Sequence, residues 1–248
     1  MIEVRQLRKS FGQQRVLDGV DFRVQKGESV VIIGRSGGGK SVLLKHLIGL
    51  LAPEEGDVLI EGVSIARMDE RQLLEVRRKF GMLFQGAALF DSLTVAENVA
   101  FVLQREAILT EAEIAVKVNE MLEMVELGGT QDKKPAELSG GMRKRVGLAR
   151  AIIYQPKIML YDEPTTGLDP VVADSIDRLI VRVRERLEVT TVAVTHDMRS
   201  ARRIGQRILM LHEGRIHFNG TPEEIFQSKD PVVHRFVNGI SDPKLANI

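Results

Sequence analysis

Apolar residues in the first part of the chain follow two strand patterns. Val20, Phe22 and Val24 alternate with polar residues, as in a strand that buries one face. The continuous apolar run from Val30 to Ile33 is bounded by glycine, which is typical of a strand buried on both faces. A further strand is expected between Asp57 and Ile65. The pattern therefore predicts a β-rich start that gives way to alternating strands and helices.

The middle of the chain, roughly residues 86–156, has a helical pattern. Thr94 with Glu97, and Thr110 with Glu113, each fit the Thr-x-x-Glu capping box that opens a helix. No repeat, low-complexity tract or linker separates this stretch from the rest of the chain. We therefore expect one domain that carries an inserted α-helical subdomain.

The last third returns to alternating strands and helices. Ile158 to Tyr161 is a buried-strand run that ends in two acids, and Thr190 to Thr195 is a further strand. Asp169 and Pro170 supply the N-cap and first-turn proline of a helix. Apolar residues recur at helical spacing behind them at Ile176, Leu179, Ile180, Val183 and Leu187. A hairpin is expected within residues 207–219. The fold class is α/β with mainly parallel core strands.

Composition narrows the classes of protein that this chain can be. It has 248 residues, 35 Lys plus Arg against 34 Asp plus Glu, a formal net charge of +1 and no cysteine. The cysteine count excludes disulfide scaffolds, zinc fingers and cysteine nucleophiles, and the balanced charge argues against a general nucleic-acid binder. No apolar run approaches the ~18 residues that span a bilayer, and the start resembles no signal peptide. We expect a soluble, cytoplasmic protein.

A glycine-rich loop follows the first buried strand. Residues 34–41 fit G-x-x-x-x-G-K-[ST], in which the glycines let backbone N–H groups surround a polyphosphate. Lys40 would reach the β- and γ-phosphates, and the Ser41 hydroxyl would ligate Mg²⁺. The alternative is a flexible glycine turn, which the strand–loop–helix context disfavours. The predicted phosphate-binding residues are Gly34, Ser36, Gly37, Gly38, Gly39, Lys40 and Ser41.

Two acids, Asp162 and Glu163, end the second buried run. Adjacent carboxylates at such a place are costly unless they handle a cation or a proton. A phosphate-bound Mg²⁺ would explain Asp162, and Glu163 would polarise an attacking water. The alternative is that one carboxylate caps the next helix.

A second glycine-rich start, Ser139-Gly140-Gly141, precedes the helical run Arg143 to Tyr154. It would expose backbone donors to an anion, although an ordinary N-cap explains the same residues. Single residues elsewhere are weaker signals. His196 ends a strand, where histidines are usually structural. Gln85 fits a surface amide, and Phe11 fits a core aromatic.

Together, these motifs resemble the nucleotide-binding subunit of ABC transporters, over nearly all of residues 1–248 and in the family's order. Phe11 falls at the A-loop aromatic, Gln85 at the Q-loop and His196 at the H-loop. The longer motifs are Walker A at 34–41, the signature at 138–142, Walker B at 158–163 and the D-loop at 167–169. The resemblance implies a P-loop NTPase core with an N-terminal antiparallel β subdomain.

The resemblance also implies the roles of the site residues. Two copies would clamp two ATP molecules head to tail, each between the Walker motifs of one subunit and Ser139–Gly141 of the other. Glu163 would be the general base, and His196, Lys40 and Gln85 would assist catalysis. Mg²⁺ would be held by Ser41, Gln85 and Asp162. Phe11 is placed against adenine, and Val16 and Asp169 are placed with the nucleotide-binding residues.

Two departures, Met142 in the signature and Arg35 in Walker A, look like the Mla/Mce-type branch, whose transporters move phospholipids between bacterial membranes. The run 82–95 and an amphipathic tail at roughly 230–248 look similar to that branch. The tail either closes its own core or docks on the neighbouring subunit. Residues 86–101 would receive the permease. The apolar patch expected there is Leu89, Phe90, Leu93 and Val95, with a place in the chain's own core as the alternative.

The branch implies a membrane permease and an Mce-domain lipid-binding subunit as partners. The chain would then lie peripherally on the inner face of the inner membrane, held through the permease. An ATPase of a small-solute importer, for example one for amino acids, shares every catalytic motif and is the alternative function.

Overall fold

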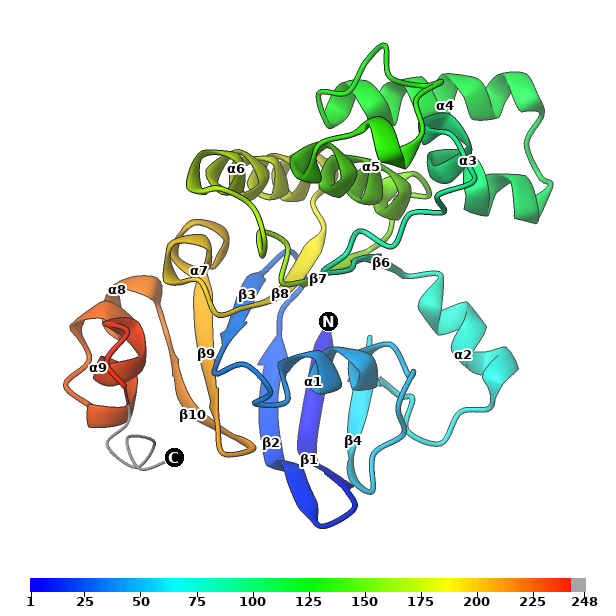
Figure 1. Ribbon diagram of the computed structural model, residues 1–248. Helices are drawn as coiled ribbons and strands as arrows, with labels where there is room; N and C mark the ends of the chain where they lie inside the picture. Colours follow the sequence, from blue (N-terminus) through cyan, green and yellow to red (C-terminus); the bar gives the residue numbers. More distant parts are fainter. Residues whose placement is uncertain (242–248) are drawn as a thin grey trace. The chain divides into compact units, whose positions relative to one another are not determined.

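The computed structural model describes residues 1–241, and the chain forms two compact units (Figure 1). The first unit contains Met1–Val76 and the chain from Val192 onward, and the second contains Arg77–Thr191. The interpretation of 1–248 as one domain, with an insertion at 86–156, stays a prediction. Among the described residues, no helix has the length and apolar character that crossing a bilayer requires.

An antiparallel sheet forms the beginning of the first unit. Its strands are β1 (Ile2–Phe11), β2 (Gln14–Val24), β4 (Glu55–Ile60) and β5 (Val63–Ser64), in the order β2-β1-β4-β5. Ile2 pairs with Val24 on one side and with Ile60 on the other. All three residues are buried, and the predicted alternating positions Val20, Phe22 and Val24 are buried as expected. The N-terminal antiparallel subdomain is therefore confirmed.

The first unit also contains the strand that leads into the glycine-rich loop. β3 (Ser29–Ile33) pairs in parallel with β9 (Arg207–His212), and β10 (Arg215–Gly220) pairs antiparallel with β9. Val30–Ile33 is completely buried, which confirms the strand buried on both faces. The hairpin of β9 and β10 turns at Glu213 and Gly214, both with positive φ. β8 (Thr190–Thr195) begins in the second unit and ends in the first.

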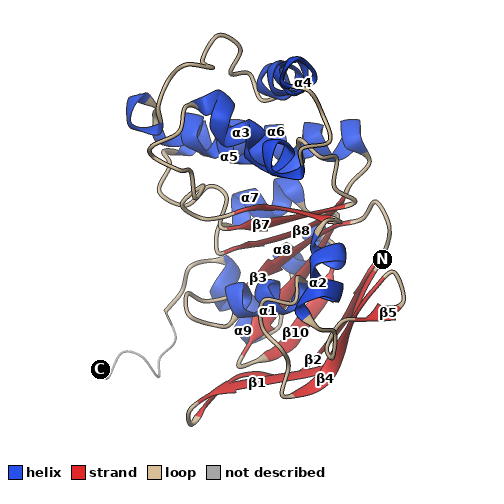
Figure 2. Cartoon of the chain, turned by 90° about the vertical axis from the view of Figure 1, so that its right-hand side faces the viewer, coloured by secondary structure: helices blue, strands red, loops and turns tan. Residues whose placement is uncertain are grey.

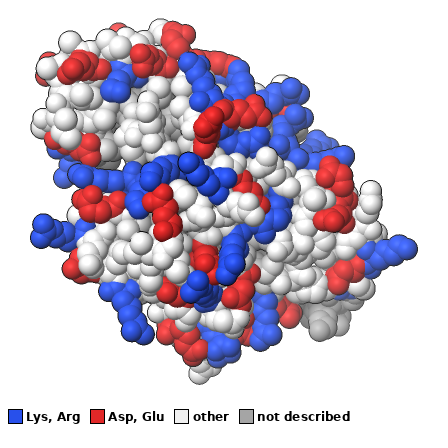
Figure 3. Space-filling view, turned by 180° about the vertical axis from the view of Figure 1, so that it is seen from behind, with Lys and Arg blue, Asp and Glu red and all other residues white. Residues whose placement is uncertain are grey.

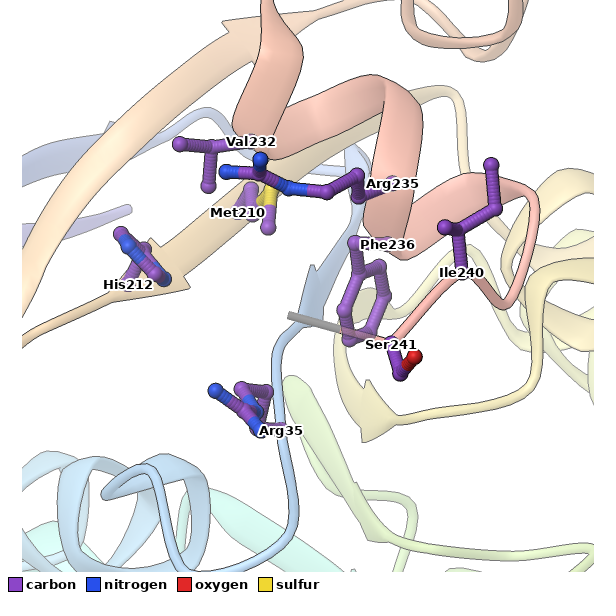
Figure 4. Close-up of a pocket in the computed structure, with 8 residues that line it drawn as sticks. All are labelled: Arg35, Met210, His212, Val232, Arg235, Phe236, Ile240 and Ser241. Carbon is purple, nitrogen blue, oxygen red and sulfur yellow. The ribbon is translucent and has the colours of Figure 1, made fainter. Parts of the chain in front are cut away.

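Short helices accompany these strands. They are α1 (Lys40–Leu47), α2 (Glu70–Arg77, which ends at the unit boundary), α7 (Met198–Ile204), α8 (Pro222–Gln227) and α9 (Pro231–Val237). The predicted tail begins with α9, where Asp230 caps the helix and Val233 is buried in its own unit. Phe236 points into a hollow that Arg35 and Met210 also line (Figure 4). A contact of the tail with a neighbouring subunit stays a prediction, and residues 242–248 lie outside the described residues.

The second unit combines a strand pair with a group of helices. β6 (Phe80–Leu83) pairs in parallel with β7 (Ile158–Asp162). The helices are α3 (Val95–Glu106), α4 (Glu111–Met124), the 3-10 helix η1 (Pro135–Glu137), α5 (Gly140–Ile152) and α6 (Pro170–Leu187). Figure 2 shows α3, α4 and α5 grouped together. The four elements between 86 and 156 are helical, as predicted.

Local sequence signals set the ends of these helices. Thr94 and Thr110 form the predicted capping boxes with Glu97 and Glu113, so each satisfies two backbone donors at a helix start. Asp169 caps α6 through the amides of Val171 and Val172. The predicted apolar face of α6 is buried from Ile176 to Val183, and Leu187 is half-buried at the end of the helix.

Candidate functional site

The glycine-rich loop of the first unit connects β3 to α1, the predicted strand–loop–helix arrangement. Gly39 caps α1 with φ 95°, a conformation that residues with a β-carbon rarely adopt. A Cβ at Gly39 would lie 2.9 Å from Val16 Cγ1 and 3.1 Å from the Val16 carbonyl oxygen. Val16 therefore packs directly against the loop. This residue supports the loop's backbone from the neighbouring sheet.

Lys40 is held close to the loop's own backbone. Its side chain is buried, and Nζ donates hydrogen bonds to the carbonyls of Gly34 at 2.8 Å and Arg35 at 3.1 Å. The ammonium and the N-terminal end of the α1 dipole thus carry positive charge at one place. Such an arrangement suits a polyphosphate.

Phe11 lies at the exposed end of β1. Its side chain is 49% exposed, and Lys9 Nζ is 5.5 Å from the ring centroid. The core-aromatic alternative for Phe11 is therefore wrong. An exposed ring beside a cation offers a face on which a planar base stacks.

His196 follows β8 and precedes α7. The histidine side chain is exposed. Asp197 caps α7 by accepting from the amides of Arg199 and Ser200, and its own amide donates to Thr195 Oγ1 at 3.0 Å. His196 therefore stands at a tightly specified turn and is not part of the buried core. A catalytic role for His196 stays a prediction.

In the second unit, Glu163 follows β7 in an unusual backbone conformation. The residue is only 8% exposed and has φ 48°. Thr166 Oγ1 donates to Glu163 Oε2 at 3.0 Å, and the Thr166 amide donates to the Glu163 carbonyl. The cap of α6 is Asp169, so the helix-capping alternative for Glu163 is wrong. The structure instead holds this carboxylate in one orientation. Left-handed residues with a β-carbon are strained, and such strain gathers at functional sites.

Ser139 is the N-cap of α5, as the N-cap alternative predicted. Its hydroxyl accepts from the Met142 amide at 3.3 Å, and no side chain at Met142 returns the bond. A Cβ at Gly140 would lie 3.2 Å from Leu168 Cδ2, and one at Gly141 would lie 2.5 Å from Val172 Cγ1. Gly141 thus lets the start of α5 approach α6 closely, and Gly140 lies against the loop that precedes α6. An anion site at Ser139–Gly141 stays a prediction, as does nucleotide contact by Asp169.

Lys144, which the sequence did not single out, links two of the predicted motifs. It is buried in α5, and its Nζ donates to the carbonyls of Gln85 and Glu163, the latter at 3.3 Å. Burial lowers the pKa of Lys144, while the nearby charges of Asp162 and Glu163 act in the opposite direction. The sequence signal that could have identified Lys144 is a charged residue on a helix face made otherwise of small and apolar residues. The Gln85 side chain itself is exposed.

Only part of the apolar patch predicted after Gln85 is exposed to solvent. Val95 is completely buried, so its placement in the patch is wrong, because this residue begins α3 and packs into the core. Phe90 is 43% exposed, and its ring lies 4.5 Å from that of Phe101. Leu89 and Leu93 are half-buried.

The predicted site residues thus fall into two groups. The first unit contains the glycine-rich loop at residues 34–41 (the phosphate loop), together with Phe11, Val16 and His196. Gln85, Ser139–Gly141, Asp162, Glu163 and Asp169 belong to the second unit, where Lys144 brings Gln85 and the acids together. The first group contains a glycine-rich loop suited to phosphate, and the second contains two adjacent carboxylates.

Comparison with known proteins identifies the family. Residues 17–166 match the protein family that is described as ABC transporter. The chain is 44% identical to the probable ribonucleotide transport ATP-binding protein mkl of Mycobacterium leprae, over 96% of this chain and 69% of that protein. It is 40% identical to the intermembrane phospholipid transport system ATP-binding protein MlaF of Haemophilus influenzae, over 98% and 92% of the two chains.

A solved structure shows the same fold. It is a dimeric, post-hydrolysis state of the ATP-binding cassette MJ0796 bound to ADP and Pi, with a TM-score of 0.81 and 33% identity over 90% of this chain and 99% of that one. The chain therefore belongs to the ABC transporter family as an ATP-binding domain. It has the α/β fold of these ATPases, and it is an ATPase.

Proposed function

We propose that this chain is the ATP-hydrolysing motor subunit of a transporter that moves phospholipids between bacterial membranes, of the Mla/Mce type. The observation that carries the proposal is the 40% identity to MlaF, which covers nearly the full length of both chains. By contrast, the matched segment makes up 69% of the mycobacterial relative. Full-length correspondence favours the lipid-transporting branch.

The first step is the binding of the nucleotide by the first unit. The Phe11 ring would stack on adenine, and the loop after β3 would surround the phosphates with its N–H groups. Lys40 would exchange its bonds to the carbonyls of Gly34 and Arg35 for phosphate oxygens. Because the ammonium is already ordered beside the loop, little side-chain entropy is lost on binding.

Three oxygen donors would hold Mg²⁺ with the nucleotide. They are the hydroxyl of Ser41, the carboxylate of Asp162 and the side-chain oxygen of Gln85, and oxygen donors are the type that Mg²⁺ prefers. The Gln85 side chain is exposed and Asp162 is half-buried at the end of β7, so both are accessible. The donor set fits the ion. When bound, Mg²⁺ neutralises charge that develops on the phosphate oxygens.

Glu163 would accept the proton of the attacking water. Its carboxylate is fixed by Thr166, and a fixed base loses no free energy in reorienting when the reaction occurs. His196 would orient the water and the γ-phosphate from the exposed turn after β8. Positioning and electrostatics of this kind supply most of the catalysis in phosphoryl transfer.

A second copy of the chain would complete each site. MJ0796 is dimeric in its solved structures. In this chain, Ser139 is exposed at the start of α5, where it can face a nucleotide bound to the partner copy. The head-to-tail dimer would then contain two composite sites, each with a phosphate loop from one copy and Ser139–Gly141 from the other.

The permease would dock on the segment after Gln85. Phe90 presents an exposed ring there, and buried Asn98 exchanges hydrogen bonds of 2.8 and 3.1 Å with the Phe90 backbone. A fixed, exposed aromatic side chain is a typical anchor for a partner. Lys, Arg, Asp and Glu are interspersed on the face drawn in Figure 3, in keeping with the net charge of +1. Attachment to the inner face of the inner membrane would therefore come through the permease, with little help from lipid charge.

An importer of small solutes is the second candidate. The name of the Mycobacterium leprae relative, a probable ribonucleotide transport ATP-binding protein, favours a small solute as the cargo. The two candidates share the phosphate loop, the acids and the signature residues. They differ in the subunits with which the ATPase assembles.

Affinity purification of the tagged, full-length chain from its native membranes separates these candidates. The proposal expects a permease together with an Mce-domain subunit that carries phospholipid, detected by mass spectrometry and lipid extraction. A Phe90→Asp variant should lose the permease, whereas Val116→Asp on exposed α4 should retain it. Recovery of a periplasmic solute-binding protein in place of the Mce-domain subunit would establish the importer.

A further inference from the structure

A buried ammonium ties together two backbone segments of the second unit. Lys144 is 5% exposed, and its Nζ donates to the carbonyl of Gln85 and to the carbonyl of Glu163 at 3.3 Å. The acceptors lie 59 and 19 residues away in the sequence. A lysine ammonium has three donors and no acceptor, so it can serve both carbonyls at once. A buried charge is retained only with such compensation.

Both of the segments that Lys144 holds contain strained backbone. Glu163 has φ 48°, and its carbonyl belongs to the peptide bond with Pro164, which disfavours helical conformations of the preceding residue. Two and three residues after Gln85, Ala87 and Ala88 have φ 60° and 50°. Left-handed residues with a β-carbon persist only when surrounding contacts hold them. Lys144 supplies one such contact to each segment.

The same face of α5 holds the rest of the loop after Gln85. Gly147 lies one turn after Lys144, and a Cβ at Gly147 would meet Leu83 and Ala87 at 2.9 to 3.2 Å. Arg150, a further turn along, donates to the carbonyls of Ala87 and Ala88 at 2.9 and 2.8 Å. Residues three apart share a helix face, so α5 is a continuous support for this loop. Of Lys144, Gly147 and Arg150 on this face, Lys144 is the residue that also hydrogen-bonds to Glu163.

We propose that Lys144 is a positioning residue for ATP hydrolysis, which fixes the Gln85 backbone and the Glu163 backbone at one separation. Gln85 would hold Mg²⁺ and Glu163 would activate water, so both roles depend on that separation. The inference rests on the proposed role of Glu163 as the base. The hydrogen bonds of Lys144 Nζ go to main-chain carbonyls, so the residue acts through the segments that carry them.

The proposal predicts a specific kinetic effect for Lys144→Met. Methionine fills a similar volume but donates no hydrogen bond, so the two segments lose their common anchor. The phosphate loop and Phe11 are in the other unit, so nucleotide affinity should be preserved. Misplacement of reacting groups by about 1 Å costs up to about 10²-fold in rate. We expect kcat to fall at least about tenfold, with KM for ATP changed less than about threefold.

Three variants of the full-length chain in its assembled transporter test this. Lys144→Arg keeps donors for both carbonyls and should recover most of kcat, whereas Lys133→Met, at an exposed lysine of the same unit, should leave both constants unchanged. Hydrogen–deuterium exchange should accelerate in residues 84–90 and 162–166 of Lys144→Met only. Thermal melting distinguishes this local effect from global unfolding, since a globally destabilised variant would exchange faster throughout.

Several outcomes would overturn the proposal. It is wrong if Lys144→Met keeps kcat within about twofold, or if the variant raises KM and leaves kcat intact. It is also wrong if exchange in the two segments is unchanged, or if the arginine variant folds but recovers nothing. Glu163→Gln, assayed in parallel, separates this failure from a failure of the proposed base. A slow Glu163→Gln beside a normal Lys144→Met refutes Lys144 alone, and a normal Glu163→Gln refutes the base assignment.

Discussion

The hydroxyl of Thr166 donates a hydrogen bond of 3.0 Å to the carboxylate of Glu163. Glu163 is buried and its backbone is left-handed, so few orientations are open to its carboxylate. The hydrogen bond from Thr166 selects one of them. In the proposed mechanism Glu163 is the general base, so the orientation of its carboxylate would decide whether the attacking water loses its proton.

Replacement of Thr166 by valine should therefore slow ATP hydrolysis without preventing it. The isosteric side chain removes the donor, and Glu163 then samples unproductive orientations. We expect kcat to fall about three- to tenfold, because a hydrogen bond of this kind contributes about 1 kcal/mol or somewhat more. Thr166→Ser keeps the hydroxyl and should retain most of the activity. Steady-state ATPase assays on both variants decide the matter, and equal rates for valine and serine would contradict the positioning role.

Gly141 should tolerate no side chain while Val172 keeps its present size. A Cβ at Gly141 would lie 2.5 Å from Val172 Cγ1, so Gly141→Ala forces α5 and α6 apart. Overpacking of this kind costs about 1–3 kcal/mol in the free energy of unfolding, which denaturant titration measures. The double variant with Val172→Ala provides the control, because it removes the methyl group that clashes. A double variant no more stable than Gly141→Ala alone would show that the clash is not the cause.

His46 should make the first unit less stable as the pH falls. It is 1% exposed, and its Nδ1 lies 2.8 Å from the Val42 carbonyl, a contact that by itself favours the protonated ring but is outweighed by burial. Burial lowers the pKa of His46 below its ordinary value of 6.5. The unfolded chain therefore binds the proton more readily, and the stabilising effect is present above about pH 6.5 and declines as the pH falls below it.

Denaturant titrations between about pH 7.5 and 5.5 test the role of His46, because carboxylates with ordinary pKa values contribute only below this range. His46→Gln should lower stability at neutral pH and flatten the decline on acidification. His234→Gln, at an exposed histidine of α9, should leave the decline as it is. An undiminished slope in His46→Gln would rule out this residue as the source.

The elements with strong local signals could be predicted from the sequence. The loop from Gly34 to Ser41, the capping boxes and the buried strand Val30–Ile33 depend on neighbours in sequence, which a pattern displays directly. Ser139 illustrates an ambiguity of such patterns, since the same residues fit an N-cap and an anion site. The structure confirms the N-cap at Ser139, and the anion site stays a prediction.

The contacts that could not be predicted join distant parts of the chain. Lys144 donates to carbonyls 59 and 19 residues away, and main-chain acceptors have no signature in the sequence. Val95 was misplaced because an apolar residue at a helix start fits a core and a surface equally well, and only tertiary packing decides. The left-handed backbone of Glu163 is likewise imposed by its surroundings.

The measurement that tests the account most directly is the single-turnover hydrolysis of ATP by Glu163→Gln, combined with its affinity for ATP and its size in solution. Loss of a general base costs roughly 10²–10⁴-fold in rate and leaves the phosphate loop untouched. We predict that the variant binds ATP with normal affinity, forms a dimer when ATP is bound and hydrolyses it at least about a hundredfold more slowly. Near-normal turnover by this variant would contradict the assignment of Glu163 and, with it, the mechanism proposed for the site.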